Sequence, residues 1–121
     1  MTRRIAWALP VLLAALIVAG VQAHMALKKA EPADHATITT PPAAVTLWFT
    51  QEPDLAVARM TLNGPGGAVK LGTLATADAM RLTAPVEGTM TDGAYTIDWQ
   101  TAGDDGHVMK GSVAFTLDRA Q

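Results

Sequence analysis

The strongest constraint on the fold of this chain is an alternation of apolar and polar side chains with a period of two residues. It recurs in four short runs, at residues 45–50, 56–62, 95–100 and 112–117. Successive side chains of a β-strand point to opposite faces of the sheet, so each run predicts a strand with one buried face. Tyr95 and Trp99 are expected on the buried face of theirs. No run after residue 24 has the apolar stripe and caps that predict a helix.

Turn-forming residues separate these runs. Pro, Gly, Asn and Asp gather at residues 31–34, 41–42, 63–67 and 92–93. Short strands at this spacing within about 100 residues predict an antiparallel β-sandwich or barrel. Residues 63–67 are expected to form a hairpin loop rather than a linker between domains.

Residues 1–23 have the composition of a secretory signal peptide. Arg3 and Arg4 precede an uncharged, apolar stretch at residues 5–20, and Ala23 ends the segment with a small side chain. The alternative is a retained membrane anchor, but a spanning helix needs about 20 apolar residues and this stretch is shorter. We therefore predict a signal peptide at residues 1–23 and one mature, secreted domain at residues 24–121 that is not inserted in the membrane.

Charge and cysteine content exclude several classes of function. Cleavage would remove two of the nine basic residues and none of the eleven acidic ones, so the net charge would fall from −2 to about −4. Nucleic-acid binding depends on clustered Lys and Arg, which this balance does not favour. The chain has no cysteine, which excludes thiolate-based zinc, iron–sulfur and blue-copper sites. Any metal must be bound by His, carboxylate, Met or the amino terminus.

Three residues are candidates for such a site: His24, Asp105 and His107. In extended backbone, residues two apart project to the same face, so Asp105 and His107 are expected to reach a common point. Cleavage after Ala23 would give His24 a free α-amino group beside its own imidazole. Each feature alone has a simpler explanation, a polar turn for Asp105 and His107 and chance for His24. Together they supply three nitrogens and one oxygen, a donor set that favours Cu(II) among the divalent first-row ions.

The sequence resembles the CopC family of periplasmic copper-binding proteins over essentially the whole chain after residue 23. The resemblance is carried by an ordered set of segments: His-Met-Ala-Leu at 24–27, Ala-Glu-Pro-Ala-Asp at 30–34, Pro-Ala-Ala-Val-Thr-Leu-Trp-Phe-Thr at 42–50, Gly-Ala-Tyr-Thr-Ile-Asp-Trp at 93–99, Asp-Gly-His at 105–107 and Lys-Gly-Ser-Val-Ala-Phe at 110–115.

The resemblance implies an immunoglobulin-like Greek-key β-sandwich of about seven strands. It also implies one Cu(II) ion per chain, bound by His24, Asp105 and His107. The implied role is copper homeostasis or resistance, by sequestering Cu(II) or delivering it to an inner-membrane copper transport protein of the CopD type.

The sequence departs from the family pattern in three places. Its methionines do not cluster around a histidine, so we expect no Cu(I) site, and Met60 is expected in the core. Gln51 stands where some members have a Glu near the copper, which leaves Glu52, one residue on, as a candidate for an outer-shell role. His35 stands where the family usually has a turn glycine, and is expected to be a surface residue rather than a second metal contact.

Two other functions are compatible with the sequence. An N-terminal His with a second His also forms the copper centre of polysaccharide-cleaving monooxygenases. Against an enzyme, the chain is short, and Asp105 would occupy a fourth metal position. The other alternative is a metal-free sandwich that serves as an adhesion or assembly module.

Overall fold

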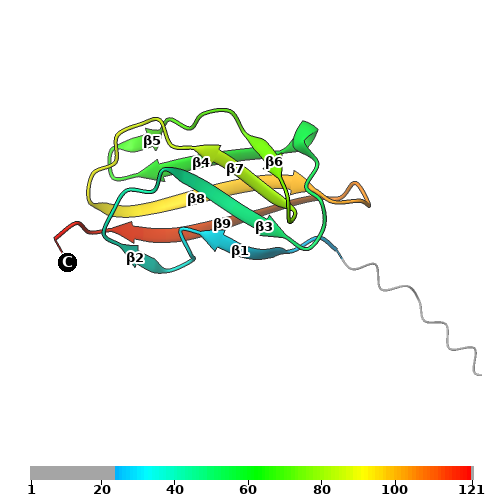
Figure 1. The fold of residues 1–121 in the computed structure, drawn as a ribbon, viewed down its shortest axis with the longest axis horizontal. Coiled ribbons are helices and arrows are strands. Elements are labelled where there is room, and N and C mark those ends of the chain that lie inside the picture. The colour runs from blue at the N-terminus through cyan, green and yellow to red at the C-terminus, as the bar shows by residue number, and fades with distance from the viewer. Residues whose placement is uncertain (1–23, 121) are drawn as a thin grey trace, which may run out of the picture.

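The computed structural model describes residues 24–120, which form two β-sheets packed face to face (Figure 1). The predicted signal peptide lies outside the described residues. The four-stranded sheet has the order β1 (Leu27–Glu31), β3 (Ala44–Phe49), β7 (Arg81–Pro85) and β6 (Ala75–Ala77). The five-stranded sheet has the order β2 (Ala36–Ile38), β9 (Val108–Leu117), β8 (Gly93–Ala102), β4 (Arg59–Gly64) and β5 (Gly67–Val69). Every pairing is antiparallel except that of β2 with β9.

The predicted all-β sandwich is confirmed, with nine strands among the described residues instead of about seven. Three of the nine strands, β2, β5 and β6, have only three residues each and are too short to show an alternation in the sequence. Within sheets, neighbouring strands are mostly not consecutive in the chain, as in Greek-key folds. The Tyr95 hydroxyl donates to the Thr91 carbonyl, a tyrosine corner of the kind found in immunoglobulin-like sandwiches.

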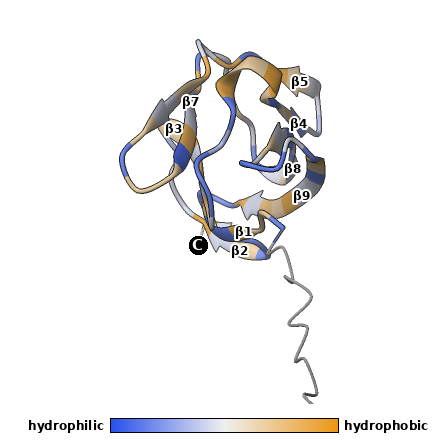
Figure 2. Ribbon diagram, turned by 90° about the vertical axis from the view of Figure 1, so that its right-hand side faces the viewer, coloured by the Kyte–Doolittle hydropathy of each residue, from blue (hydrophilic) through white to orange (hydrophobic). Residues whose placement is uncertain are grey.

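The core consists of the inward-facing residues of the long strands. Seen from the end of the sandwich, the two sheets lie on opposite sides of this interior, with β3 and β7 in one and β4, β8 and β9 in the other (Figure 2). The buried residues include the alternating set predicted from the sequence: Val45, Leu47, Phe49, Tyr95, Ile97, Trp99, Val113, Phe115 and Leu117. Met60 is partly buried against this core, as expected.

One predicted strand begins later than the sequence pattern indicates. The run at residues 56–62 was expected to be extended throughout, but Leu55–Val57 forms a short 3₁₀ helix, η1, and β4 begins at Arg59. The cause is Asp54, whose side chain accepts a hydrogen bond from the Ala56 backbone N–H and so caps a helical turn. The hairpin predicted at residues 63–67 is confirmed, since β4 and β5 pair with Gly64 opposite Gly67.

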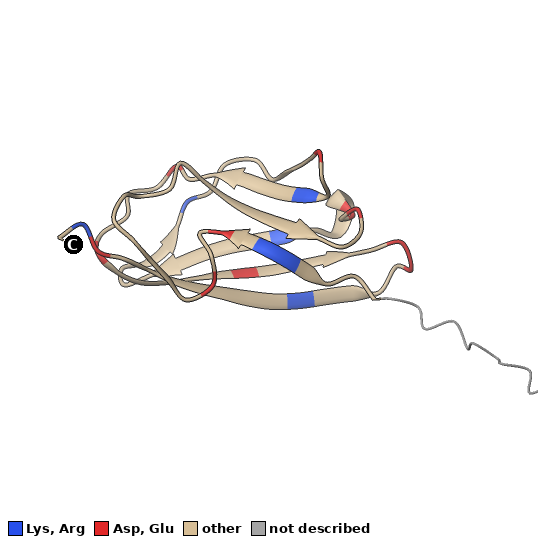
Figure 3. Cartoon of the chain, turned by 60° about the horizontal axis from the view of Figure 1, so that its bottom comes forward, with Lys and Arg blue, Asp and Glu red and all other residues tan. Residues whose placement is uncertain are grey.

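The charged residues are distributed differently over strands and loops. Figure 3 shows most of the Lys and Arg residues on strands, whereas many of the Asp and Glu residues lie at the ends of strands or in loops. The loop between β8 and β9 carries two adjacent carboxylates, Asp104 and Asp105. None of the helical segments in residues 24–120 is long and apolar enough to cross a membrane.

Candidate metal centre

The β8–β9 loop positions two of the three candidate ligands. The loop turns at residues 103–106, where the Gly106 N–H donates to the Gly103 carbonyl at 3.0 Å. Gly106 has a φ of 75°, in the left-handed region that strains residues with a Cβ. Asp105 closes the loop from within, because its Oδ1 accepts from the His107 backbone N–H at 3.0 Å.

This loop corrects one step of the sequence argument. Asp105 and His107 were expected to share a face because extended backbone alternates, yet the segment is a turn with Gly106 in a left-handed conformation. The two side chains do meet, at 3.0 Å between Asp105 Oδ2 and His107 Nδ1. They do so because the Asp105 carboxylate hydrogen-bonds to the residue two positions later, as Asp side chains often do in turns.

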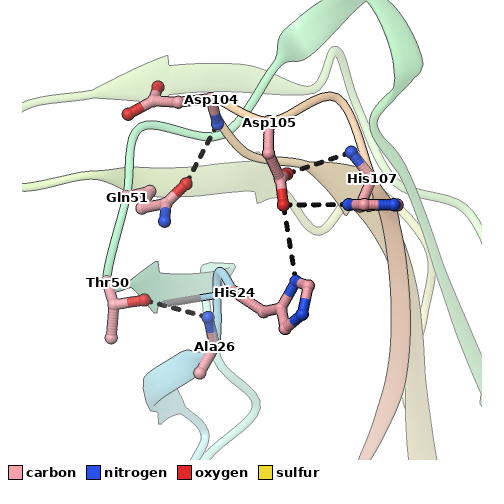
Figure 4. Close-up of polar contacts among 7 residues, drawn as sticks. All are labelled: His24, Ala26, Thr50, Gln51, Asp104, Asp105 and His107. Carbon is pink, nitrogen blue, oxygen red and sulfur yellow. Dashed lines mark hydrogen bonds and ion pairs between the residues drawn. The ribbon is translucent and has the colours of Figure 1, made fainter. Parts of the chain in front are cut away.

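The segment before β1 brings His24 to the same place. Met25 is 1% exposed and packs into the core, which anchors the segment. Ala26 then pairs with the residue that follows β3: its N–H donates to Thr50 Oγ1, and its carbonyl accepts from the Thr50 N–H, both at 2.9 Å. Because Met25 and Ala26 are anchored in this way, the His24 side chain lies next to Asp105 of the β8–β9 loop (Figure 4).

Asp105 is the centre of the cluster. Its Oδ2 lies 3.0 Å from His107 Nδ1 and 3.4 Å from His24 Nδ1 (Figure 4). The two imidazole rings form a T-shaped pair, with an interplanar angle of 72° and centroids 5.5 Å apart. One potential ligand atom from each residue lies within 4.8 Å of the others, and among the described residues no other group of three or more His, Cys, Asp or Glu side chains meets this spacing.

The cluster is open to solvent on its histidine side. The side chains of His24 and His107 are 60% and 66% exposed, whereas that of Asp105 is 17% exposed. The hydrogen bond between the Asp105 carboxylate and the His107 side chain lowers the pKa of Asp105 below its usual value of 3.8, and the bond from the His107 backbone lowers it further. Asp105 is therefore an anion at neutral pH and is available as a metal ligand.

The other candidates from the sequence lie outside the cluster. His35 is in a surface turn with a φ of 64°, which explains why a glycine would suit this position, and its side chain is 84% exposed. This confirms the expected surface location. Glu52 is exposed, and among the polar contacts of the described residues it makes none with His24, Asp105 or His107. Its proposed outer-shell role therefore has no support in these contacts.

Gln51 has a role that the sequence did not reveal. Its Oε1 accepts from the Asp104 backbone N–H at 2.9 Å, which ties the segment after β3 to the β8–β9 loop. The only sequence signal was its position, directly after the alternating run of β3. A side-chain bond to a backbone N–H about 50 residues away has no local sequence pattern.

Known proteins match this chain over most of its length. The CopC domain model matches residues 27–118. Protein YobA from Escherichia coli K12 is 30% identical over 119 residues, which cover 95% of each chain. Copper resistance protein C from Xanthomonas campestris pv. juglandis is 30% identical over 123 residues, covering 95% of this chain and 96% of that protein.

Two solved structures share the fold. CopC from Methylosinus trichosporium OB3b superimposes with a TM-score of 0.71 at 25% identity, over 81% of this chain and 97% of that one. PcoC, a methionine-rich copper resistance protein from E. coli, also has a TM-score of 0.71, at 22% identity and over 79% and 100% of the two chains. The match of the domain model to residues 27–118, together with these relatives, shows that the chain belongs to the CopC family.

Proposed function

We propose that this protein binds one Cu(II) ion in the periplasm after cleavage between Ala23 and His24. The ligands are the α-amino group and imidazole of His24, the carboxylate of Asp105 and the imidazole of His107. The observation that carries the proposal is the convergence of His24 and His107 on one oxygen of Asp105, from opposite ends of the domain sequence.

The donor types support Cu(II) over other common ions. Imidazole and amine nitrogens with one carboxylate suit a tetragonal Cu(II) site, whereas Ca²⁺ and Mg²⁺ favour oxygen ligands. Zn²⁺ accepts similar donors but favours a tetrahedron. The chain has no cysteine to hold Cu(I), so reduction of the bound ion is expected to weaken binding and to offer a route for release.

The family and its named members support a role in copper resistance. Two of the proteins described above are copper resistance proteins by name. We propose that this chain sequesters Cu(II) in the periplasm or delivers it to an inner-membrane copper transport protein of the CopD type. Binding without turnover is sufficient for this role, and the proposal includes no enzymatic step.

Titration of the mature chain, beginning at His24, tests this function. In competition with a Cu(II) chelator of known affinity at pH 7.5, we expect saturation at one Cu(II) per chain. Electron paramagnetic resonance of the complex is expected to show a tetragonal site with nitrogen donors. A mature chain that fails to compete for Cu(II), or that takes up Zn²⁺ more tightly, would contradict the proposal.

Copper affinity should fall as the pH drops, because imidazole and amine nitrogens must be free of protons to bind metal. Its hydrogen bonds to His107 lower the pKa of Asp105, so this carboxylate stays ionised to more acidic pH than an ordinary Asp. We therefore expect the apparent Cu(II) affinity to decrease with each step from about pH 8 to pH 5, measured by competition with a chelator whose own protonation is corrected for. An apparent affinity independent of pH over this range would contradict nitrogen ligands.

A further inference from the structure

The two halves of the proposed copper site are joined through a third segment. His24 belongs to the segment before β1, and Asp105 belongs to the β8–β9 loop. Thr50 and Gln51 follow β3 directly and lie beside both segments, next to Ala26 and Asp104 respectively (Figure 4). Both residues make side-chain hydrogen bonds, one to each half of the site.

Thr50 holds the histidine side. It exchanges two hydrogen bonds with Ala26, both 2.9 Å long, through its own N–H and its Oγ1. The bond from the Thr50 N–H to the Ala26 carbonyl joins backbone atoms only. The bond from the Ala26 N–H depends on the Thr50 hydroxyl oxygen, which therefore adds a second point of attachment. Ala26 is two residues from His24, and Met25 between them is buried, so the backbone that leads to His24 is anchored.

Gln51 holds the carboxylate side. Its Oε1 accepts from the N–H of Asp104, the residue immediately before Asp105. Space for this amide depends on Gly103: a Cβ there would lie 2.3 Å from Gln51 Oε1 and 3.0 Å from the Met25 Cβ. The β8–β9 loop, Gln51 and the Met25 anchor therefore pack together at a position that leaves no room for a larger residue.

We propose that Thr50 and Gln51 form a positioning pair that holds His24 and Asp105 at ligand distance before copper arrives. The inference rests on the proposed copper site and assigns a function to two residues that do not bind the metal. Chain ends fray unless they are tied down, and a frayed His24 would have to be ordered at the expense of binding free energy. Groups that orient metal ligands typically contribute a factor of about 10–100 to metal affinity.

Paired substitutions test the role of each side chain. Thr50→Val and Gln51→Leu keep the approximate shape but remove the acceptor oxygen, whereas Thr50→Ser and Gln51→Glu retain it. In the mature chain we expect T50V and Q51L each to weaken Cu(II) binding by about 10- to 100-fold and to change the copper hyperfine pattern in electron paramagnetic resonance. T50S and Q51E are expected to keep the wild-type spectrum, and Q51E, which adds a negative charge, should bind copper no more weakly.

A matched control separates positioning from general destabilisation. Thr83→Val removes a part-buried hydrogen bond between the hydroxyls of Thr83 and Thr46, whose oxygens are 2.8 Å apart. This pair joins β3 to β7 and does not include any of the three ligands. We expect T83V to lower the melting temperature at least as much as T50V while leaving Cu(II) affinity and the spectrum unchanged. Wild-type affinity and spectrum in both T50V and Q51L would overturn the proposal.

Hydrogen exchange in the metal-free protein gives a readout that does not depend on copper. We expect the Ala26 amide to exchange faster in T50V, and the Asp104 amide to exchange faster in Q51L, with core amides of β8 unchanged. Unchanged exchange at both amides would refute the positioning pair even if copper binds. If the wild-type mature chain binds no Cu(II), the proposed copper site is wrong. Faster exchange in the two variants would then still show that Thr50 and Gln51 hold the Ala26 and Asp104 amides.

Discussion

A mature chain acetylated on the α-amino group of His24 is expected to lose its tight Cu(II) binding. Acetylation converts the amine into an amide, a poor metal donor, so the chelate ring of the His24 amine and imidazole cannot form. Loss of groups that merely orient ligands weakens metal binding by about 10- to 100-fold, so losing a ligand itself should cost more than about 100-fold. Competition with a Cu(II) chelator at pH 7.5 measures the change.

The control is amidation of the Gln121 carboxyl group, which caps the other end of the chain without touching the site. We expect this variant to bind copper like the unmodified mature chain. If the acetylated chain binds with unchanged affinity, the amine is not a ligand and the assignment of the site is wrong. If neither the acetylated nor the unmodified chain binds copper, a metal-free interaction role is favoured instead.

Replacing His107 by alanine is expected to have the second largest effect. The substitution removes one nitrogen donor and also the partner that lowers the pKa of Asp105, so both the donor set and its organisation suffer. We expect a loss of Cu(II) affinity of more than about 100-fold on the same reasoning as for the amine. Because the His107 side chain is 66% exposed, the free energy of unfolding should change by no more than about 0.5 kcal/mol.

His35→Ala is the matched control for this experiment. His35 has the same side chain and is also exposed, and it lies beside a carboxylate, with its Nε2 3.3 Å from Asp34 Oδ2. It is not part of the His24, Asp105 and His107 cluster, so we expect its loss to leave copper stoichiometry and affinity unchanged. Equal losses in H107A and H35A, measured by titration of both variants, would mean that copper binds to exposed histidines without a defined site.

Much of the fold could be read from the sequence because alternation is a local property. The runs around Val45, Ile97 and Phe115 mark strands whose inward residues are buried in the structure. The prediction of extended backbone was wrong at residues 56–57, which lie in a 3₁₀ turn capped by the Asp54 side chain, the acceptor for the Ala56 N–H. Such a cap competes directly with strand geometry, and the alternation of the surrounding residues gave no sign of it.

The candidate ligands were also identified from the sequence, but partly for the wrong geometric reason. Asp105 and His107 meet in a turn closed by the Asp105 side chain and by Gly106, and not through the pleat of a strand. His24 was grouped with them because of its donor atoms and was then implied by the family resemblance, but no local sequence pattern showed that it would approach the Asp105 carboxylate. No sequence pattern indicated that Thr50 and Gln51 connect the two halves.

By itself, the sequence determined the strand runs, the composition of the core, the lack of thiolate ligands and the identity of the three candidate donors. These properties depend on residue type and on spacing over a few positions, which a chain carries before it folds. The tertiary structure alone decided that His24, Asp105 and His107 lie within 4.8 Å of one another and that Thr50 and Gln51 tie their segments together. Apart from the local contact of Asp105 with His107, those contacts join residues about 25 to 80 positions apart. They arise only when the two sheets pack and bring the start of β1, the end of β3 and the β8–β9 loop to one end of the sandwich.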